Sequence, residues 1–397
     1  MGTNEPSKAL LPKLYYLTAT LTSAAVSAAN TYVPFYLRSL GATYVVSGIP
    51  LVVRGIGRVT FDVSSIYLMG RLHPQRVFLW GVALGAVALL MCGVFPSAHA
   101  VIGAYFFVGV GMAMLHIALR QIVFDGATKG RRGRAMGLLS VFIGAGPILG
   151  IVSGGFVAEY LGYRSLFLSS GAVILWLPMA FAYSSRSETT EPKDKESGSG
   201  LRMGVVREIL GTSGAPLLCA CSFFSLFYQQ VRGLAVAFYS TDIVGLSLGS
   251  YGLMRSISQL GNVSGRYFGG GWTDKAGIGA CLVAGFLISA VGYGMISWSD
   301  GFWSLLLVHT TIGVGAGMVN VASQVGIMSI VSQELRGQAM GLYRAVGDVG
   351  MLVGPVLITS SLERLGFDDS FTWMAIVPLF LTVAAFLSRG TLSEAIR

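Results

Sequence analysis

Long apolar windows separated by short polar stretches run along the whole chain. A helix that crosses the hydrocarbon core of a membrane needs about 20 predominantly apolar residues, and the sequence offers about twelve windows of that length. They lie at about 12–37, 43–70, 76–95, 99–125, 134–160, 164–183, 212–240, 247–271, 278–298, 301–330, 336–362 and 370–388. This pattern predicts an all-α polytopic membrane protein with about twelve transmembrane helices.

The windows fall into two copies of one unit. Residues 107–167 match residues 311–371 at one constant shift in numbering, without gaps. The shared positions are Gly109 with Gly313, Gly111 with Gly315, Arg132-Gly133 with Arg336-Gly337, Ala135-Met136-Gly137 with Ala339-Met340-Gly341, Gly146 with Gly350, Gly150 with Gly354, Glu159 with Glu363, and Leu161-Gly162 with Leu365-Gly366. Such a repeat in an apolar chain is typical of transporters built from pseudo-symmetric halves, so we predict two six-helix bundles.

The composition changes abruptly between the two copies. The stretch that begins at Ser184 reads SSRSETTEPKDKESGSG, which is polar, charged and rich in serine. Stretches of this kind do not bury enough apolar surface to fold by themselves. We therefore predict an N-terminal bundle at 1–183, a cytoplasmic linker at 184–204 and a C-terminal bundle at 205–397.

Composition excludes an ordinary water-soluble domain. Charged residues make up 11% of the chain against 53% hydrophobic residues, and 54 residues are glycine. Four cysteines, at 92, 219, 221 and 281, all lie inside apolar windows, which favours buried thiols over a metal site. No set of residues with ligand spacing or nucleophile–base spacing stands out, so we expect no enzyme activity, no metal and no cofactor.

The net charge of +9 is concentrated in alternate loops. The basic residues of those loops are Arg71, Arg76, Lys129, Arg131, Arg132, Arg134, Arg186, Lys193, Lys195, Arg202 and Arg207. Loops rich in Lys and Arg stay on the cytoplasmic side, so the asymmetry places both termini and the central linker there. The positive charge therefore indicates orientation in the cytoplasmic membrane rather than nucleic-acid binding.

The second window carries the most charge within a predicted span. Arg54, Arg58 and Asp62 recur every four residues, which places them on one face of a helix. Each charge at the centre of a membrane costs about 2.5–3.5 kcal/mol, so these side chains are expected to face protein or water. One interpretation is that Arg58 and Asp62 neutralise each other and only stabilise the bundle. The other interpretation is that the three residues form a functional site, because neutralisation of Arg58 by Asp62 would leave Arg54 unpaired.

Further polar residues occur inside the windows of both halves. The candidate proton-coupling residues are Asp62, Asp348, His116 and His309. The candidate cavity residues are Arg54, Arg58, Arg120, Tyr228, Gln229, Arg232, Arg255, Gln259, Asn262, Asn320, Gln324 and Arg344. The third, sixth, ninth and twelfth windows contain long stretches without charge, at 77–95, 166–183, 280–298 and 371–387. We therefore expect these four helices to face lipid while the other eight surround an aqueous cavity.

The repeat relates some of these polar residues to one another. Asn320 and Gln324 match His116 and Arg120, and His309 stands at the position of Tyr105. When Gly270 is aligned with Gly70, Asn262 takes the place of Asp62. The two halves are therefore expected to present partly matched polar groups.

The segment Gly270-Gly271-Trp272-Thr273-Asp274-Lys275-Ala276-Gly277 resembles the G-x-x-x-D-R/K-x-G loop signature of the major facilitator superfamily. The resemblance extends over essentially the whole chain. It implies that Asp274 and Lys275, flanked by Gly270 and Gly277, belong to a gating network between the two halves.

The sequence departs from the family pattern at three places. The first copy of the loop, at 70–76, lacks the aspartate. Gly146-Pro147 and Gly150 match part of the antiporter motif of the fifth span, but Phe142 takes its upstream glycine position. The arginine that drug/proton antiporters carry in the fourth span falls on Tyr105. The charge line of the second window resembles relatives near the drug-efflux branch more than sugar porters.

Together these features predict a monomeric secondary active transporter in the lipid bilayer, which exports a small organic solute in exchange for protons, with Asp62 as the first choice of proton carrier. No phosphate-binding loop for ATP occurs in the chain. Aromatic residues suited to amphipathic solutes support export: Phe227, Tyr228, Phe238, Tyr239 and Tyr343.

Two alternatives stay open at this point. The excess of arginine over acid at central positions favours uptake or exchange of an organic anion that carries a carboxylate or a phosphate. A receptor or assembly factor without transport activity is the other alternative, because a fold does not determine a function.

Overall fold

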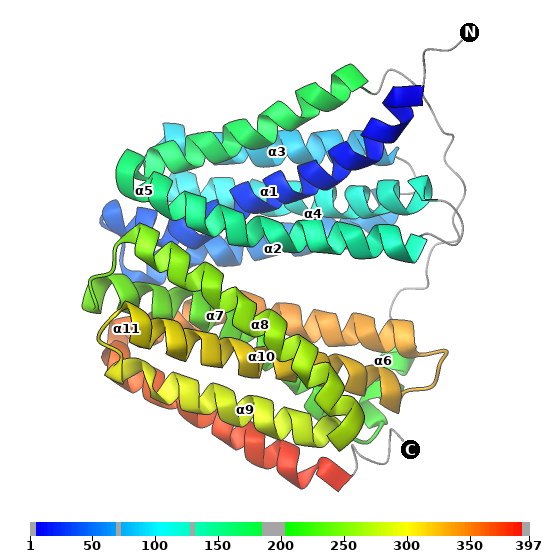
Figure 1. Cartoon of the computed structure of the whole chain (residues 1–397), viewed down its shortest axis with the longest axis vertical. Coiled ribbons are helices and arrows are strands. Elements are labelled where there is room, and N and C mark those ends of the chain that lie inside the picture. Colours follow the sequence, from blue (N-terminus) through cyan, green and yellow to red (C-terminus); the bar gives the residue numbers. More distant parts are fainter. Residues whose placement is uncertain (1–4, 69–72, 128–131, 185–202, 391–397) are drawn as a thin grey trace. The chain divides into compact units, whose positions relative to one another are not determined.

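The computed structural model describes residues 5–68, 73–127, 132–184 and 203–390, and the regular elements in these ranges are all helices. In chain order they are α1 (Glu5–Ser39), α2 (Tyr44–Leu68), α3 (Pro74–Val94), α4 (Ala98–Gly126), α5 (Arg132–Ser184), α6 (Met203–Gly211), α7 (Ala215–Phe238), η1 (Tyr239–Ile243), α8 (Leu248–Ala276), α9 (Ile278–Gly294), η2 (Ile296–Trp298), α10 (Phe302–Ile330) and α11 (Arg336–Leu387). Figure 1 shows their course along the chain.

The chain divides into two compact units, Met1–Ser197 and Gly198–Arg397. Unit 1 contains α1 to α5, and unit 2 contains α6 to α11. Residues 185–202, most of the predicted linker, lie outside the described residues. Gly70 and Arg71 of the incomplete first loop signature lie outside them as well.

Two helices are each a pair of spans joined at a glycine. Gly162 in α5 has φ 82° and ψ 165°, and Gly366 in α11 has φ 78° and ψ −175°. Divided at these glycines, the described chain has six long helical segments in unit 1, from α1 to the second half of α5. Unit 2 likewise has six, from α7 to the second half of α11. The prediction of twelve helices in two bundles is confirmed.

By length and composition, seven of the described helices could cross a membrane, or eight if the bent pair α6 and α7 is taken as one span. The helices α1 and α8 are long enough but more polar. In α8 the polar residues include Arg255, Gln259 and Asn262. These three residues are half-buried, whereas Arg266, one turn beyond Asn262, is exposed.

Glycines allow the helices of each unit to touch along their backbones. In unit 1, α2 packs on α4, where a Cβ added to Gly57 would overlap the Phe106 carbonyl oxygen. In unit 2, α8 packs on α10, where a Cβ added to Gly261 would lie 2.6 Å from the Thr310 carbonyl oxygen. These two contacts are related by the numbering shift of the repeat, so the duplicated sequence forms duplicated packing.

This packing corrects one equivalence expected from the sequence. Because Gly57 corresponds to Gly261, Asn262 corresponds to Arg58 and not to Asp62. The residue of unit 2 that corresponds to Asp62 is Arg266. The alignment of Gly270 with Gly70 was wrong because it matched single glycines without regard to the helix contacts. The two halves thus carry opposite charges at the position of Asp62.

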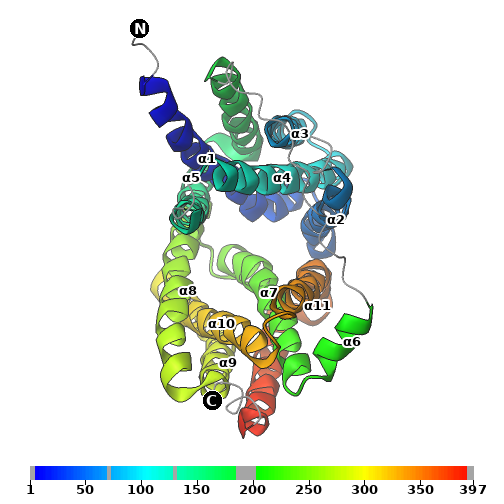
Figure 2. The ribbon, with the colours of Figure 1, turned by 90° about the vertical axis from the view of Figure 1, so that its right-hand side faces the viewer.

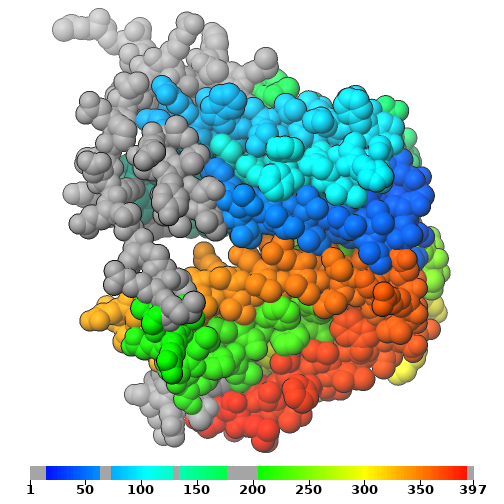
Figure 3. Space-filling view, turned by 180° about the vertical axis from the view of Figure 1, so that it is seen from behind, coloured from blue at the N-terminus to red at the C-terminus, as the bar shows by residue number. Residues whose placement is uncertain are grey.

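Uncharged helices place large apolar side chains on the surface of their own unit. Exposed residues of this kind are Trp80, Val87, Met91 and Val94 on α3, Val173, Leu175 and Trp176 on α5, Leu287 and Val291 on α9, and Ile376, Leu379, Phe380, Val383 and Phe386 on α11. The second half of α11, red in Figure 3, forms part of the visible surface of unit 2. Such exposed apolar faces suit contact with lipid.

The two hinge glycines provide a test of the fold. Their combination of positive φ with extended ψ is accessible essentially only to glycine, and other residues held in such regions cost about 1–3 kcal/mol each. We expect Gly162→Ala and Gly366→Ala each to lower the thermal-unfolding midpoint of the purified protein. Gly144→Ala is the control, because this glycine lies within α5 and faces open space. An unchanged midpoint in both hinge variants would contradict the hinge geometry.

Candidate functional site

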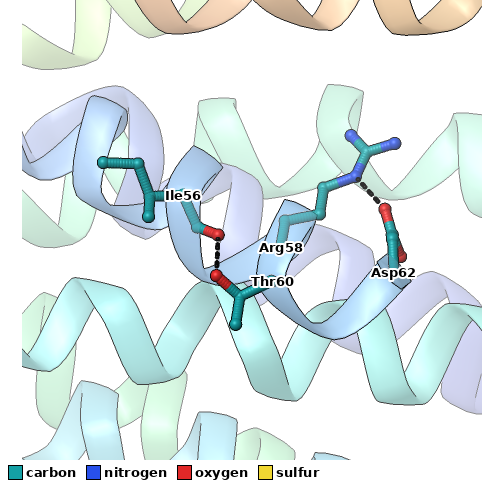
Figure 4. A network of polar contacts seen from close by, with 4 residues as sticks. All are labelled: Ile56, Arg58, Thr60 and Asp62. Carbon is teal, nitrogen blue, oxygen red and sulfur yellow. Dashed lines mark hydrogen bonds and ion pairs between the residues drawn. The ribbon is translucent and has the colours of Figure 1, made fainter. Parts of the chain in front are cut away.

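An ion pair in α2 joins two of the three charges predicted to share a face. The Arg58 Nε atom lies 3.5 Å from Asp62 Oδ2, and their side chains are 50% and 40% exposed (Figure 4). The neighbouring contact in the same helix is structural, since the Thr60 hydroxyl donates to the Ile56 carbonyl at 2.9 Å. The pair is therefore accessible on the surface of unit 1 and not sealed in its core.

Arg54 lies in a different environment from this pair. It is half-buried, and its Nε atom is buried without a hydrogen-bond partner. The backbone of Arg54 touches α4, because a Cβ on Gly109 would overlap the Arg54 carbonyl oxygen. The three charges thus divide into an exposed pair and a separate arginine at the contact between α2 and α4.

In α4, His116 and Arg120 differ in exposure although they are one turn apart. His116 is half-buried, and its Nε2 atom has no partner. Arg120 is exposed. Their counterparts in α10 bond to each other, because Gln324 Nε2 donates to Asn320 Oδ1 at 2.7 Å. The predicted matched pairs therefore occupy matching positions but make different contacts.

The densest group of polar candidates lies in unit 2, where α10 packs against α7 and α8 (Figure 2). Arg232 of α7 is 6% exposed, and its Nη2 donates to Gln259 Oε1 of α8 at 3.3 Å. Arg255 of α8 donates through Nη1 to the Arg232 carbonyl at 3.0 Å. Asn262, two turns along α8, donates through Nδ2 to the Gly313 carbonyl of α10 at 3.3 Å. Hydrogen bonds thus link Arg232, Arg255 and Gln259 across α7 and α8, and Asn262 links α8 to α10.

His309 belongs to the same region. It is 1% exposed, and neither of its ring nitrogens has a hydrogen-bond partner. It interacts electrostatically with Arg232 and Arg255. We refer to Arg232, Arg255 and His309 below as the cationic cluster.

Other candidates are not gathered into this region. Gln229 and Arg344 are exposed, and Asp348 is half-buried. Although Arg344 and Asp348 have the spacing of Arg58 and Asp62, they form no ion pair in the described structure.

The aromatic residues expected to offer a surface to amphipathic solutes are buried instead, and their contacts lie within unit 2. Those residues are Phe227, Tyr228, Phe238, Tyr239 and Tyr343. Tyr228 donates to the Met374 carbonyl at 2.9 Å, and its ring centroid lies 4.9 Å from that of Tyr293. Tyr343 shares a hydrogen bond of 2.8 Å with Ser323. Tyrosine in a bundle also serves as an apolar core residue with one polar end, and these contacts fit that role.

Two buried polar residues were missed by the reasoning from sequence. The Tyr105 hydroxyl is fully buried without a hydrogen-bond partner, and it stands where His309 stands in the other unit. Tyr293 donates to the Tyr228 carbonyl at 3.3 Å. The repeat contained the signal for Tyr105, since the position matches a histidine in a window otherwise poor in ionisable groups. Tyr293 had no such signal. No group of three or more potential metal ligands occurs in the described part of the chain.

Comparison with known proteins identifies the family of this architecture. The model of the Major Facilitator Superfamily matches residues 15–241 and 218–394. The chain belongs to this superfamily. It is therefore a membrane transporter and not an enzyme.

Relatives within the superfamily are distant but cover most of the chain. "Multidrug resistance protein MdtG" of Enterobacter lignolyticus is 24% identical over 381 residues, which is 93% of this chain and 89% of that protein. The protein of the same name from Citrobacter koseri is 23% identical over 381 residues, with 93% and 92% covered. An uncharacterised MFS-type transporter of Bacillus subtilis, YceJ, is 22% identical over 326 residues, with 80% and 81% covered.

Solved structures of transporters share the fold. A bacterial homologue of the human lysosomal transporter Spinster, in an inward-facing conformation, has a TM-score of 0.80 at 13% identity and covers 99% of both chains. The nucleoside transporter NupG has a TM-score of 0.80 at 13% identity, with 95% of this chain and 98% of its own covered. At these identities the likeness concerns the fold alone.

The superfamily signature at 270–277 lies at the end of a helix and not in the loop that was expected. The residues from Gly270 to Ala276 continue α8, and the helix ends at Gly277 with φ 88°. The segment was expected to be a loop because it resembles the loop signature of the superfamily. A helix that leaves the membrane can continue as a polar helix, and here the chain turns only at the last glycine. Asp274 and Lys275 are exposed and form no ion pair with a described residue.

Proposed function

We propose that this transporter works by alternating access and exports a small organic solute in exchange for protons. The observation that carries the proposal is the accessible ion pair between Arg58 and Asp62 in α2. Protonation of Asp62 would remove its negative charge and leave Arg58 without its partner, so one proton changes the charge of this helix face. The multidrug resistance proteins that resemble the chain over 93% of its length support export over uptake.

We also propose a topology for this function. The protein lies in the cytoplasmic membrane as a monomer, with both termini and the linker at 184–204 in the cytoplasm. The two bundles, 1–183 and 205–397, move relative to each other and expose bound solute alternately on the two sides. Support comes from the basic residues concentrated in alternate loops.

Transport by purified protein in sealed vesicles tests the direction of coupling. We expect an acidic lumen to drive accumulation of a lipophilic dye such as ethidium in that lumen, because each proton that leaves is exchanged for solute that enters. An ionophore that collapses the pH gradient should abolish the accumulation, and vesicles without protein provide the baseline. Solute movement in the same direction as the protons would exclude export by exchange.

The runner-up is uptake or exchange of an organic anion. It is favoured by a separate observation, the pairing of Arg232 with Arg255 inside unit 2 without a carboxylate partner between them. In the vesicle experiment, this function would appear as movement of a labelled carboxylate together with protons, or in exchange for another anion.

A further inference from the structure

The cationic cluster of unit 2 contains buried hydrogen-bond donors without acceptors. Arg232 is only 6% exposed, and its Nη1 atom has no hydrogen-bond partner among the described residues. The Nε of Arg255 is likewise buried without a partner. A guanidinium group stays charged in a protein and cannot avoid this cost by losing its proton. A buried charge without an opposite charge is destabilising, so the presence of two such arginines in the core of unit 2 requires a reason.

The neighbours of the cluster do not supply a negative charge. The described ionisable groups that interact with Arg232 are Arg255, Arg266, Tyr251 and Tyr293. Those that interact with His309 are Arg232 and Arg255. None of these groups is a carboxylate. Among the described residues, the cluster therefore combines positive charge with neutral donors and acceptors.

Glycines let the neighbouring helix backbones approach both guanidinium groups closely. A Cβ on Gly313 of α10 would lie 3.2 Å from Arg232 Nη1, the atom that has no acceptor. A Cβ on Gly233 of α7 would lie 3.3 Å from Arg255 Nη2. Arg255 and Gln259 are half-buried, whereas Arg232 is buried, so the polar path runs from the surface of α8 into the unit.

The fold does not require these charges. Under the numbering shift of the repeat, Leu51 of α2 occupies the place of Arg255. Arg232 corresponds to Ala28 or Ala29 of α1, so an alanine takes its place in either alignment. Unit 1 thus forms the same bundle with apolar residues at both arginine positions, which points to a role for the arginines other than packing.

We propose that Arg232, Arg255 and His309 form the binding site for an oxyanion group, a carboxylate or a phosphate, of the transported solute. Arginine binds such groups through two parallel hydrogen bonds, and the unpartnered Arg232 Nη1 and Arg255 Nε supply donors. Gln259 orients Arg232 through their hydrogen bond. The proposal rests on the proposed transport function, because the anion is taken to be part of the transported solute. The assignment of the site does not depend on the direction of transport.

Ligand-dependent thermal stability of the full-length purified protein tests the site. The probes are benzoate and phenyl phosphate, with neutral benzamide and cationic benzylamine as probes of similar size, all at equal ionic strength. We expect the anions alone to raise the unfolding midpoint of the unmodified protein. We expect Arg232→Gln and Arg255→Gln to weaken the apparent affinity for the anion about 10-fold or more, because each removes hydrogen bonds to a charged group.

The matched control is Arg364→Gln, which removes an exposed arginine of the same unit. It should keep the response to anions. Arg255→Gln provides a second variant if Arg232→Gln does not fold. Absence of any stabilisation by either anion, equal stabilisation by benzamide, or an unchanged anion response in both folded cluster variants would overturn the proposal.

Combining this measurement with the vesicle experiment separates the two proposals. An anion response that depends on Arg232, in a protein that moves no solute along a pH gradient, would retain the binding site and overturn the transport proposal. Dye export that is driven by the pH gradient, in a protein that shows no anion response, would retain the transport proposal and overturn the binding site.

Discussion

Replacement of Asp62 by asparagine is expected to abolish proton-driven transport while the protein remains folded. Asparagine has nearly the same shape as aspartate but cannot carry the exchangeable proton, so solute movement would lose its link to the pH gradient. We expect gradient-driven accumulation in vesicles to fall by about 10-fold or more, the scale of a change of 1.4 kcal/mol or more in coupling. Exchange of labelled for unlabelled solute without a gradient should persist.

A double variant distinguishes a coupling role from a structural one. If the pair of Arg58 with Asp62 serves only to neutralise charge, Arg58→Gln combined with Asp62→Asn should restore both stability and gradient-driven transport. If Asp62 carries the proton, the double variant should recover stability but not coupling. Asp242→Asn is the control, because this exposed acid lies in η1 of unit 2, where its Oδ1 accepts from the Thr241 hydroxyl. Full gradient-driven transport by Asp62→Asn would contradict the assignment.

Much of the fold could be predicted because the membrane restricts what a long apolar window can form. The lengths of the windows determined the helices, and the repeat determined the two bundles. The hinges at Gly162 and Gly366 were present in the repeat as a shared Leu-Gly pair, and apolar windows were predicted on both sides of each. The windows did not show that a single glycine joins the two helices in each case.

The candidate site could be predicted only in part, because a sequence shows which residues are polar but not what they face. Arg232 and Arg255 are far apart in sequence from His309, and only the packing of α7, α8 and α10 brings them together. For the same reason sequence spacing does not distinguish Arg58 and Asp62, which form an ion pair, from Arg344 and Asp348, which form none in the described structure. The polar end of α8 was expected to be a loop. The helix ends only at Gly277, where the backbone has a positive φ that composition does not show.

The contact between α8 and α10 is expected to be the most sensitive packing site in unit 2. A Cβ added to Gly265 would overlap the Val314 carbonyl oxygen, which belongs to the backbone and cannot move without its helix. Overpacking costs about 1–3 kcal/mol and occasionally more. We expect Gly265→Leu to lower the thermal-unfolding midpoint strongly or to prevent recovery of folded protein, whereas Gly271→Leu, whose Cβ meets open space, should not.

The repeat extends this prediction to the other unit. Gly57 makes the same kind of contact with the Phe106 carbonyl in the pair of α2 with α4, so Gly57→Leu should be about as harmful as Gly265→Leu. Midpoints measured by thermal unfolding of all three variants would check this, and a mild effect at both close-contact glycines would contradict rigid backbone packing. Such packing matters for the proposed mechanism because alternating access requires each bundle to move as a unit. The charges of α2 and of the cationic cluster are both held on these closely packed helices, so a loosened contact would displace a charged site along with the helix that carries it.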